Sequence, residues 1–179
     1  AQALGALLLG DVGDHHHVQA LFAGDALGRV LKAAGAKVTQ EFYINDRGRQ
    51  MDLFGQSVQA AALGNPIPED GYQGDYIKDL AKIVVAENPG ISTSEEFREA
   101  AYQVQLAEQQ SVLQTFHTKF DVWFSERSLS DGGAIDRALE RLRSNGVVYE
   151  KDGAQWFRAT DFGDEKDRVV VRENGIKTY

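Results

Sequence analysis

Apolar residues near the start of the chain follow a helical spacing and then an alternating one. Between Val18 and Leu31 they recur at steps of three and four residues, which predicts one buried helix face. Gly35 predicts the end of that helix, because glycine adopts the left-handed conformation of a C′ residue without a steric clash. From Val38 to Ile44 the side chains then alternate between two faces, as in a strand. The predicted buried helix face consists of Val18, Leu21, Phe22, Ala26, Val30 and Leu31.

A second helix is predicted directly after this strand, from Asp46 to Leu63. Asn45 and Asp46 are suited to cap its amino-terminus, since their side chains accept hydrogen bonds from free backbone N–H groups. Its apolar stripe is Met51, Phe54, Val58 and Ala62. Alternation of helix, strand and helix is typical of layered α/β domains, in which ligands bind at the carboxyl ends of the strands.

The middle of the chain continues with helical patterns and one further strand. A helix is predicted from Asp75 to Glu87, and a long helix opens at a capping box formed by Ser92 and Glu95. The stretch from Phe120 to Ser125 is rich in β-branched and aromatic residues and predicts a strand.

The carboxyl-terminal third predicts a helix and two hairpins. Asp131 is suited to cap the helix, and Asn145 with Gly146 marks its end. Asp152-Gly153 and Asn174-Gly175 each separate two short apolar runs, and both dipeptides favour a type I′ turn.

Composition limits the classes of protein that the chain can represent. Its 179 residues, 42% of them hydrophobic, suffice for one domain or for one domain with an insertion. The absence of cysteine excludes disulfides, thiolate metal sites and a cysteine nucleophile. A net charge of −8 is opposite to that of a dominant phosphate-binding surface. The apolar segment 1–10 is shorter than the roughly 20 residues of a membrane span, and we expect it to form the first buried strand.

Several segments resemble one family in that family's order. GDALGRVLKAAG followed by EFYINDRGRQ is similar to the segment after the nucleotide-binding signature of arginyl-tRNA synthetases, which are class I aminoacyl-tRNA ligases. The resemblance continues through YQGDYIKDLA, FDVWFSE, LERLRSNGVVYEK and TDFGDEKDRVVV. It implies an α/β chain with a partial class I, Rossmann-like nucleotide-binding fold and an α+β connective insertion that ends in hairpins. Residues 1–70 would be the first half of the nucleotide-binding fold and residues 71–179 the insertion.

The resemblance also implies site residues. The family's His-x-Gly-His signature falls on Asp14, His15, His16 and His17, which would bind ATP, and His17, the only matching residue, would be catalytic. Asn45, Asp46 and Tyr179 would surround the amino acid. For Asn45 and Asp46, helix capping alone is an alternative explanation.

The implied function is that of a fragment or remnant of an arginine–tRNA ligase that is inactive as this chain alone. Its cofactor would be ATP with Mg²⁺, with no resident metal, and its partners arginine and tRNA, in the cytoplasm and away from membranes. A face left exposed where further parts of the fold would pack favours self-association.

Two other functions remain open at this stage. One is a non-catalytic binding or scaffold module derived from the synthetase fold. The other is a metal-dependent hydrolase built on Asp14, His15 and His17, because imidazole and carboxylate groups suit Zn²⁺ or Ni²⁺. No general base or nucleophile completes the hydrolase.

Overall fold

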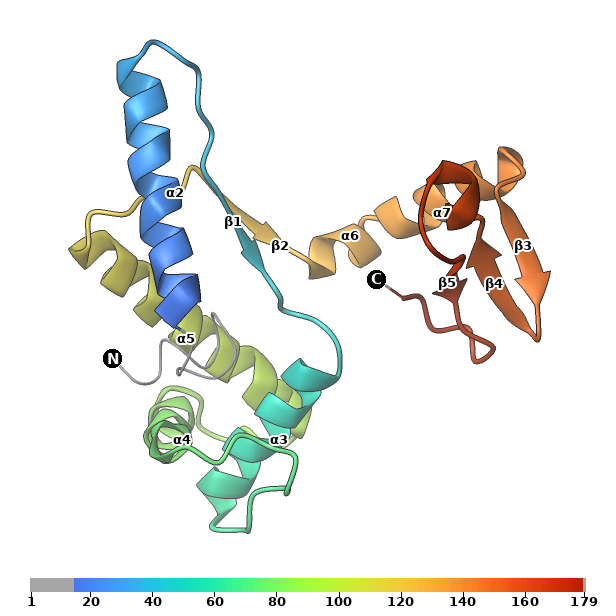
Figure 1. The fold of residues 1–179 in the computed structure, drawn as a ribbon. Coiled ribbons are helices and arrows are strands. Elements are labelled where there is room, and N and C mark those ends of the chain that lie inside the picture. Colours follow the sequence, from blue (N-terminus) through green and yellow to red (C-terminus); the bar gives the residue numbers. More distant parts are fainter. Residues whose placement is uncertain (1–14, 179) are drawn as a thin grey trace. The chain divides into compact units, whose positions relative to one another are not determined.

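The fold was analysed in a computed structural model that describes residues 15–178, with side chains from Leu21 onward. The chain divides into two compact units after Arg127. Figure 1 shows the described elements in chain order. None of the described helices is long and apolar enough to cross a membrane. The predicted boundary after residue 70, between the first half of a nucleotide-binding fold and an insertion, stays a prediction.

A parallel pair of strands forms the sheet of the first unit. β1 (Glu41–Ile44) pairs with β2 (Val122–Ser125), and Ile44 lies opposite Ser125. Both strands begin later than predicted. At Gln40 the backbone N–H donates to the Asp121 carboxylate at 2.8 Å, so a side chain takes the place of a strand partner. The α/β character is thereby confirmed for the described part of the chain.

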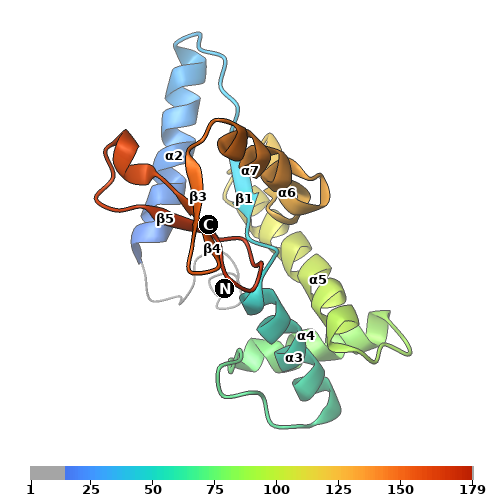
Figure 2. The same ribbon diagram turned by 90° about the vertical axis from the view of Figure 1, so that its right-hand side faces the viewer.

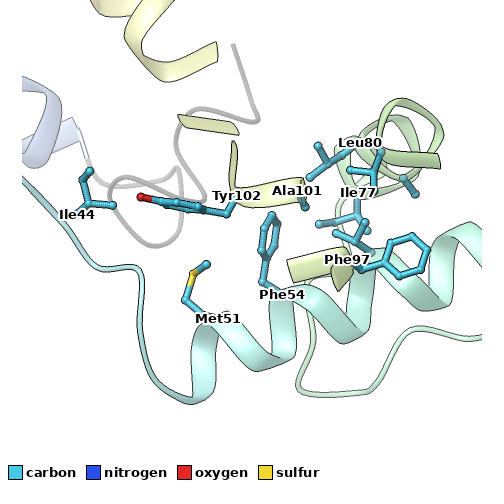
Figure 3. Packing of buried hydrophobic residues seen from close by; sticks show 11 residues of the cluster. Ile44, Met51, Phe54, Ile77, Leu80, Phe97, Ala101 and Tyr102 are labelled. Carbon is cyan, nitrogen blue, oxygen red and sulfur yellow. The ribbon is translucent and has the colours of Figure 1, made fainter. Parts of the chain in front are cut away.

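Three helices connect the two strands and hold the core. They are α3 (Arg49–Leu63), α4 (Asp75–Glu87) and α5 (Ser94–Thr115), which pack on one another in both ribbon views (Figures 1 and 2). Phe54, Ile77 and Phe97 are almost completely buried between them (Figure 3). At Gly55 an added Cβ would lie 2.4 Å from the Ser94 carbonyl oxygen, so α3 and α5 approach as closely as their backbones allow.

The caps of these helices differ from the predicted ones. α3 begins at Arg49 with Gly48 as N-cap and no side-chain cap, so the predicted capping by Asn45 and Asp46 is wrong. The capping box of α5 is formed by Thr93 and Glu96, one residue later than predicted. Hydrogen bonds from the Thr93 and Ser92 backbone hold the pKa of the Glu96 carboxyl at about 2. The helix between them, α4, has the predicted bounds.

Helix α2 (His15–Ala33) ends as predicted, with Gly35 at φ 88°, but four residues of its predicted buried face are exposed: Phe22, Ala26, Val30 and Leu31. Asp25 and Gly28 of this helix instead lie against Gln40, just before β1. The Gln40 side-chain amide donates to the Asp25 carboxylate at 3.3 Å. A Cβ added at Gly28 would lie 3.1 Å from Gln40 Cδ, so a larger residue at position 28 would crowd this side chain. This packing accounts for Asp25 and Gly28 in the Gly-Asp-x-x-Gly segment. The exposed apolar side chains of α2 are Phe22, Leu27, Val30 and Leu31.

The second unit combines helices with an antiparallel sheet. The chain runs through α6 (Arg127–Asp131), α7 (Ala134–Ser144), β3 (Val148–Lys151), β4 (Ala154–Phe157), η1 (Ala159–Phe162) and β5 (Arg168–Val171). The strands are ordered β3-β4-β5, as Figure 1 shows. Gly133, not the predicted Asp131, is the N-cap of α7.

The two predicted turns have different outcomes. Asp152 and Gly153 have φ values of 52° and 73°, as a type I′ turn requires, so the first hairpin is confirmed. In the second, Gly175 is left-handed, with φ 78°, and Asn174 is not. The Gly175 N–H donates to the Arg172 carbonyl at 2.9 Å, which closes a turn one residue earlier, so type I′ is wrong there.

Candidate functional site

The buried carboxylate of Asp46 joins the carboxyl ends of β1 and β2. Asp46 follows β1 and is 4% exposed. Its Oδ2 accepts from the Ser125 hydroxyl at 2.5 Å and from the Tyr102 hydroxyl at 3.3 Å, and its Oδ1 accepts from the Arg127 backbone N–H at 2.9 Å. Three donors from β2, α5 and the start of α6 therefore satisfy one buried charge.

The Arg127 side chain also contacts Asp46, through the Asp46 backbone. Its Nη2 donates to the Asp46 carbonyl at 3.1 Å, and its Nη1 donates to Glu99 Oε2 at 2.8 Å. The guanidinium also lies 5.7 Å from the centre of the Tyr102 ring, within the range of a cation–π contact. Arg127 thus links the loop after β1 to helix α5.

Charges beyond Arg127 continue the network across two helices. Arg98 donates to Glu99 at 3.0 Å and to Asp52 at 2.8 Å, so α5 and α3 are joined as well. Burial of Glu99 favours its neutral form, yet hydrogen bonds from Arg127 and Arg98 outweigh burial and lower its pKa. Burial, and then the Asp46 charge, raise the pKa of Tyr102 to about 12, so its hydroxyl stays protonated and donates.

A small hollow of about 50 Å³ lies beside the end of β1. Exposed Asn45 and buried Gln109 contribute amide groups to its lining. The remaining lining residues are Phe42, Tyr43, Ile44, Met51, Tyr102 and Leu106. Polar as well as aromatic and aliphatic residues form the wall, so a ligand at this end of β1 could meet both kinds of contact.

The predicted site residues fall partly within this region. Asn45 and Asp46 lie together at the end of β1, but only Asn45 is exposed. His15, His16 and His17 form the first turn of α2 rather than a loop, and the structure does not describe their side chains. Asp14, Tyr179 and the expected first strand lie outside the described residues. The roles assigned to these residues stay predictions.

Sequence reasoning missed Tyr102, Ser125 and Arg127. Ser125 and Arg127 flank the predicted strand end, and the rule that sites form at carboxyl strand ends could have drawn attention to them. Tyr102 offered no such signal, because an aromatic residue in a helix stripe indicates core packing first.

The described residues at the start of α2 fit an anion. The first turn contains no acidic residue, and free backbone N–H groups at a helix start attract phosphate. No group of three or more His, Cys, Asp or Glu able to hold a metal occurs among the described side chains.

Comparison with solved structures shows the class of protein. The fold is shared with an arginyl-tRNA synthetase structure from Campylobacter jejuni at a TM-score of 0.79 and 34% identity, over 91% of this chain and 38% of that one. It is also shared with arginyl-tRNA synthetase from Plasmodium falciparum at a TM-score of 0.64 and 11% identity, over 91% of this chain and 29% of that one, which shows the fold alone. The α/β architecture is thus that of an aminoacyl-tRNA ligase.

Comparison with curated relatives identifies the family within this class of protein. The chain is 48% identical over 162 residues to arginine–tRNA ligase of Kineococcus radiotolerans, which is 87% of this chain and 29% of the relative. It is 49% identical over 169 residues to the same ligase of Renibacterium salmoninarum, which is 91% of this chain and 31% of the relative. The chain belongs to the arginine–tRNA ligase family, and it spans about 30% of the length of these relatives. No model of a known protein family matches it.

Proposed function

We propose that this chain is part of the catalytic domain of an arginine–tRNA ligase, which activates arginine with ATP and transfers it to tRNA in the cytoplasm. The observation that carries the proposal is the likeness over 91% of the chain, at 34% identity and a TM-score of 0.79, to a solved arginyl-tRNA synthetase. The carboxyl ends of β1 and β2 are where such a fold binds its ligands.

Most of the predicted site residues have a role in this proposal. The amino-terminus of α2, with His15, His16 and His17, would approach the ATP phosphates, and Asp14 lies next to them in sequence. Bound ATP with Mg²⁺ would supply the activated phosphate. Asn45 would contact arginine at the end of β1, and Tyr179 would lie near the substrate.

We further propose that the chain does not catalyse arginine activation alone. Asp14 adds a negative charge and His16 a bulky side chain where the family's signature has histidine and glycine, and both changes oppose a triphosphate. A net charge of −8 also offers little attraction to the tRNA polyanion.

Arginine-dependent exchange of pyrophosphate into ATP tests this proposal. The purified chain should show no exchange above background, with or without tRNA. The double variant Asp14→His with His16→Gly restores the family's signature and should strengthen ATP binding. The control is His117→Ala, which changes a histidine elsewhere in the chain and should leave ATP binding unchanged. Robust exchange by the unaltered chain, lost in His17→Ala, would show instead that the altered signature still works.

The exposed apolar face of α2 favours a second candidate function, a non-catalytic binding module. Val30 and Leu27 are 64% and 59% exposed on a helix whose pattern predicts burial. Such a face favours self-association. Sedimentation equilibrium should then show an oligomer that Val30→Asp dissociates, and a monomer at high concentration would remove the support for this candidate.

A further inference from the structure

The environment of Asp46 separates it from its neighbour Asn45. Asp46 is buried, and its two carboxylate oxygens already accept three hydrogen bonds. A guanidinium bound in bidentate fashion needs two free, parallel acceptor positions on one carboxylate. Asn45, one residue earlier, is exposed and lines the hollow beside β1. Asp46 is therefore engaged within the fold, and Asn45 is available to a ligand.

We propose that Asp46 and Arg127 are positioning residues: they lock the carboxyl ends of β1 and β2 together and hold Asn45 in place for the substrate without touching it. The naming of arginine as that substrate rests on the proposed function.

Two sets of contacts support this clamp, which comprises Asp46, Arg127, Ser125 and Tyr102. The strand ends are tied by hydrogen bonds from Ser125 and from the Arg127 backbone to the Asp46 side chain. The loop backbone is tied independently, because the Arg127 guanidinium donates to the Asp46 carbonyl. Asp46, the residue that follows Asn45, is therefore held by its side chain and by its main-chain carbonyl. Groups that orient a contact residue in this way act on the ligand through geometry.

The Glu99 carboxylate supplies the anchor for Arg127. Its 2.8 Å contact with Nη1 comes from α5, the same helix that carries Tyr102. Because α5 packs against α3 in the core, the clamp rests on a rigid element and not on the loop alone. Arg127→Lys would keep the positive charge but lose the planar guanidinium group, which donates to two acceptors at once.

The first arm of the test measures amide hydrogen exchange by NMR in the full chain. Asp46→Ala removes the acceptor of the Arg127 backbone N–H, and exchange of that amide should become about tenfold faster or more, as expected for a lost protecting bond. Arg47→Ala is the matched control, because it changes an exposed cation one residue away. Equal exchange of the Arg127 amide in both variants would overturn the clamp. If Asp46→Ala does not fold, Asp46→Leu fills the space without an acceptor and serves in its place.

The second arm titrates L-arginine and follows the side-chain amide signals of Asn45. Removing a cation next to a carboxylate strengthens binding of a cationic ligand if that carboxylate contacts it directly. Under the clamp, Arg127→Ala should instead weaken arginine binding by roughly tenfold or more, since Asn45 is displaced. Arg127→Lys should recover part of the loss, and Arg47→Ala should not reproduce it. Binding by Arg127→Ala that equals or exceeds the wild type would overturn the positioning role.

The two arms distinguish failure of the clamp from failure of the proposed function. A wild-type chain that does not bind arginine contradicts the proposed substrate, whereas the Arg127 exchange rate still decides whether the strand ends are locked. Arginine binding that survives every clamp variant contradicts the positioning role and leaves the proposed function intact.

Discussion

Helices α2 and α3 have similar apolar patterns in the sequence and opposite surroundings in the fold. In α3 the stripe formed by Met51, Phe54 and Val58 is buried. In α2 the stripe residues Phe22, Val30 and Leu31 are exposed, and the helix contacts Gln40, just before β1, through Asp25 and Gly28. Periodicity reports which residues share a helix face. Burial of that face depends on what the rest of the protein places against it.

The comparison predicts its largest effect at Phe54. Phe54→Ala removes a fully buried ring and should lower the free energy of unfolding by about 3–5 kcal/mol. Leu27→Ala, at a position 59% exposed on α2, should change it by less than about 0.5 kcal/mol. Urea denaturation of both variants measures the difference. A comparable loss for Leu27→Ala would mean that the α2 face is covered in solution, and its dependence on protein concentration would identify self-association.

Substitutions at two helical glycines should change stability by smaller amounts and in opposite directions from each other. Gly55→Ala forces a Cβ to within 2.4 Å of the Ser94 carbonyl, and overpacking of this kind costs about 1–3 kcal/mol. A Cβ added at Gly24 of α2 would meet nothing within 4 Å beyond its chain neighbours and its own helix backbone, so Gly24→Ala should stabilise the helix by roughly 0.5–1 kcal/mol. Thermal unfolding compares them. The contrast between the helices is refuted if both substitutions destabilise equally.

The smallest of these effects concerns the capping box of α5. Thr93→Ala should destabilise the chain by about 1 kcal/mol, and Ser92→Ala by less, because only Thr93 accepts from the Glu96 N–H. The pKa of Glu96 is lowered in the fold, so its contribution is present above its unfolded pKa of about 4.3 and is lost as pH falls toward about 2. Stability measured between these pH values in Glu96→Ala should show a flatter dependence than in the wild type.

Local patterns predicted most of the helices and turns. The bounds of α4 follow from its stripe, and the Asp152-Gly153 turn follows from a dipeptide that tolerates left-handed backbone. The cap of α5 was misplaced because the neighbours Ser92 and Thr93 can both cap. The cap of α3 was misplaced because the Asp46 side chain accepts from Ser125 and Arg127 instead, and the helix begins after Gly48.

The candidate site was less predictable, because its contacts join distant parts of the chain. Asp46 and Ser125 are 79 positions apart, and no local pattern pairs them. The strand-end rule drew attention to the end of β1, and the role of that region stays a prediction. It did not indicate that Asp46 is buried and Asn45 exposed, since that depends on the pairing of β1 with β2 and on Tyr102 from α5.

The division of the chain after Arg127 has a spectroscopic consequence. The protein has two tryptophans, and they fall one in each unit, with Trp123 on β2 and Trp156 on β4. Trp123 lies 4.8 Å from the Phe42 ring, whereas Trp156 has Lys151 over its face. Intrinsic fluorescence of Trp123→Phe and Trp156→Phe therefore reports on each unit in turn. Coincident transitions would indicate one cooperative unfolding event, and separate transitions would indicate two.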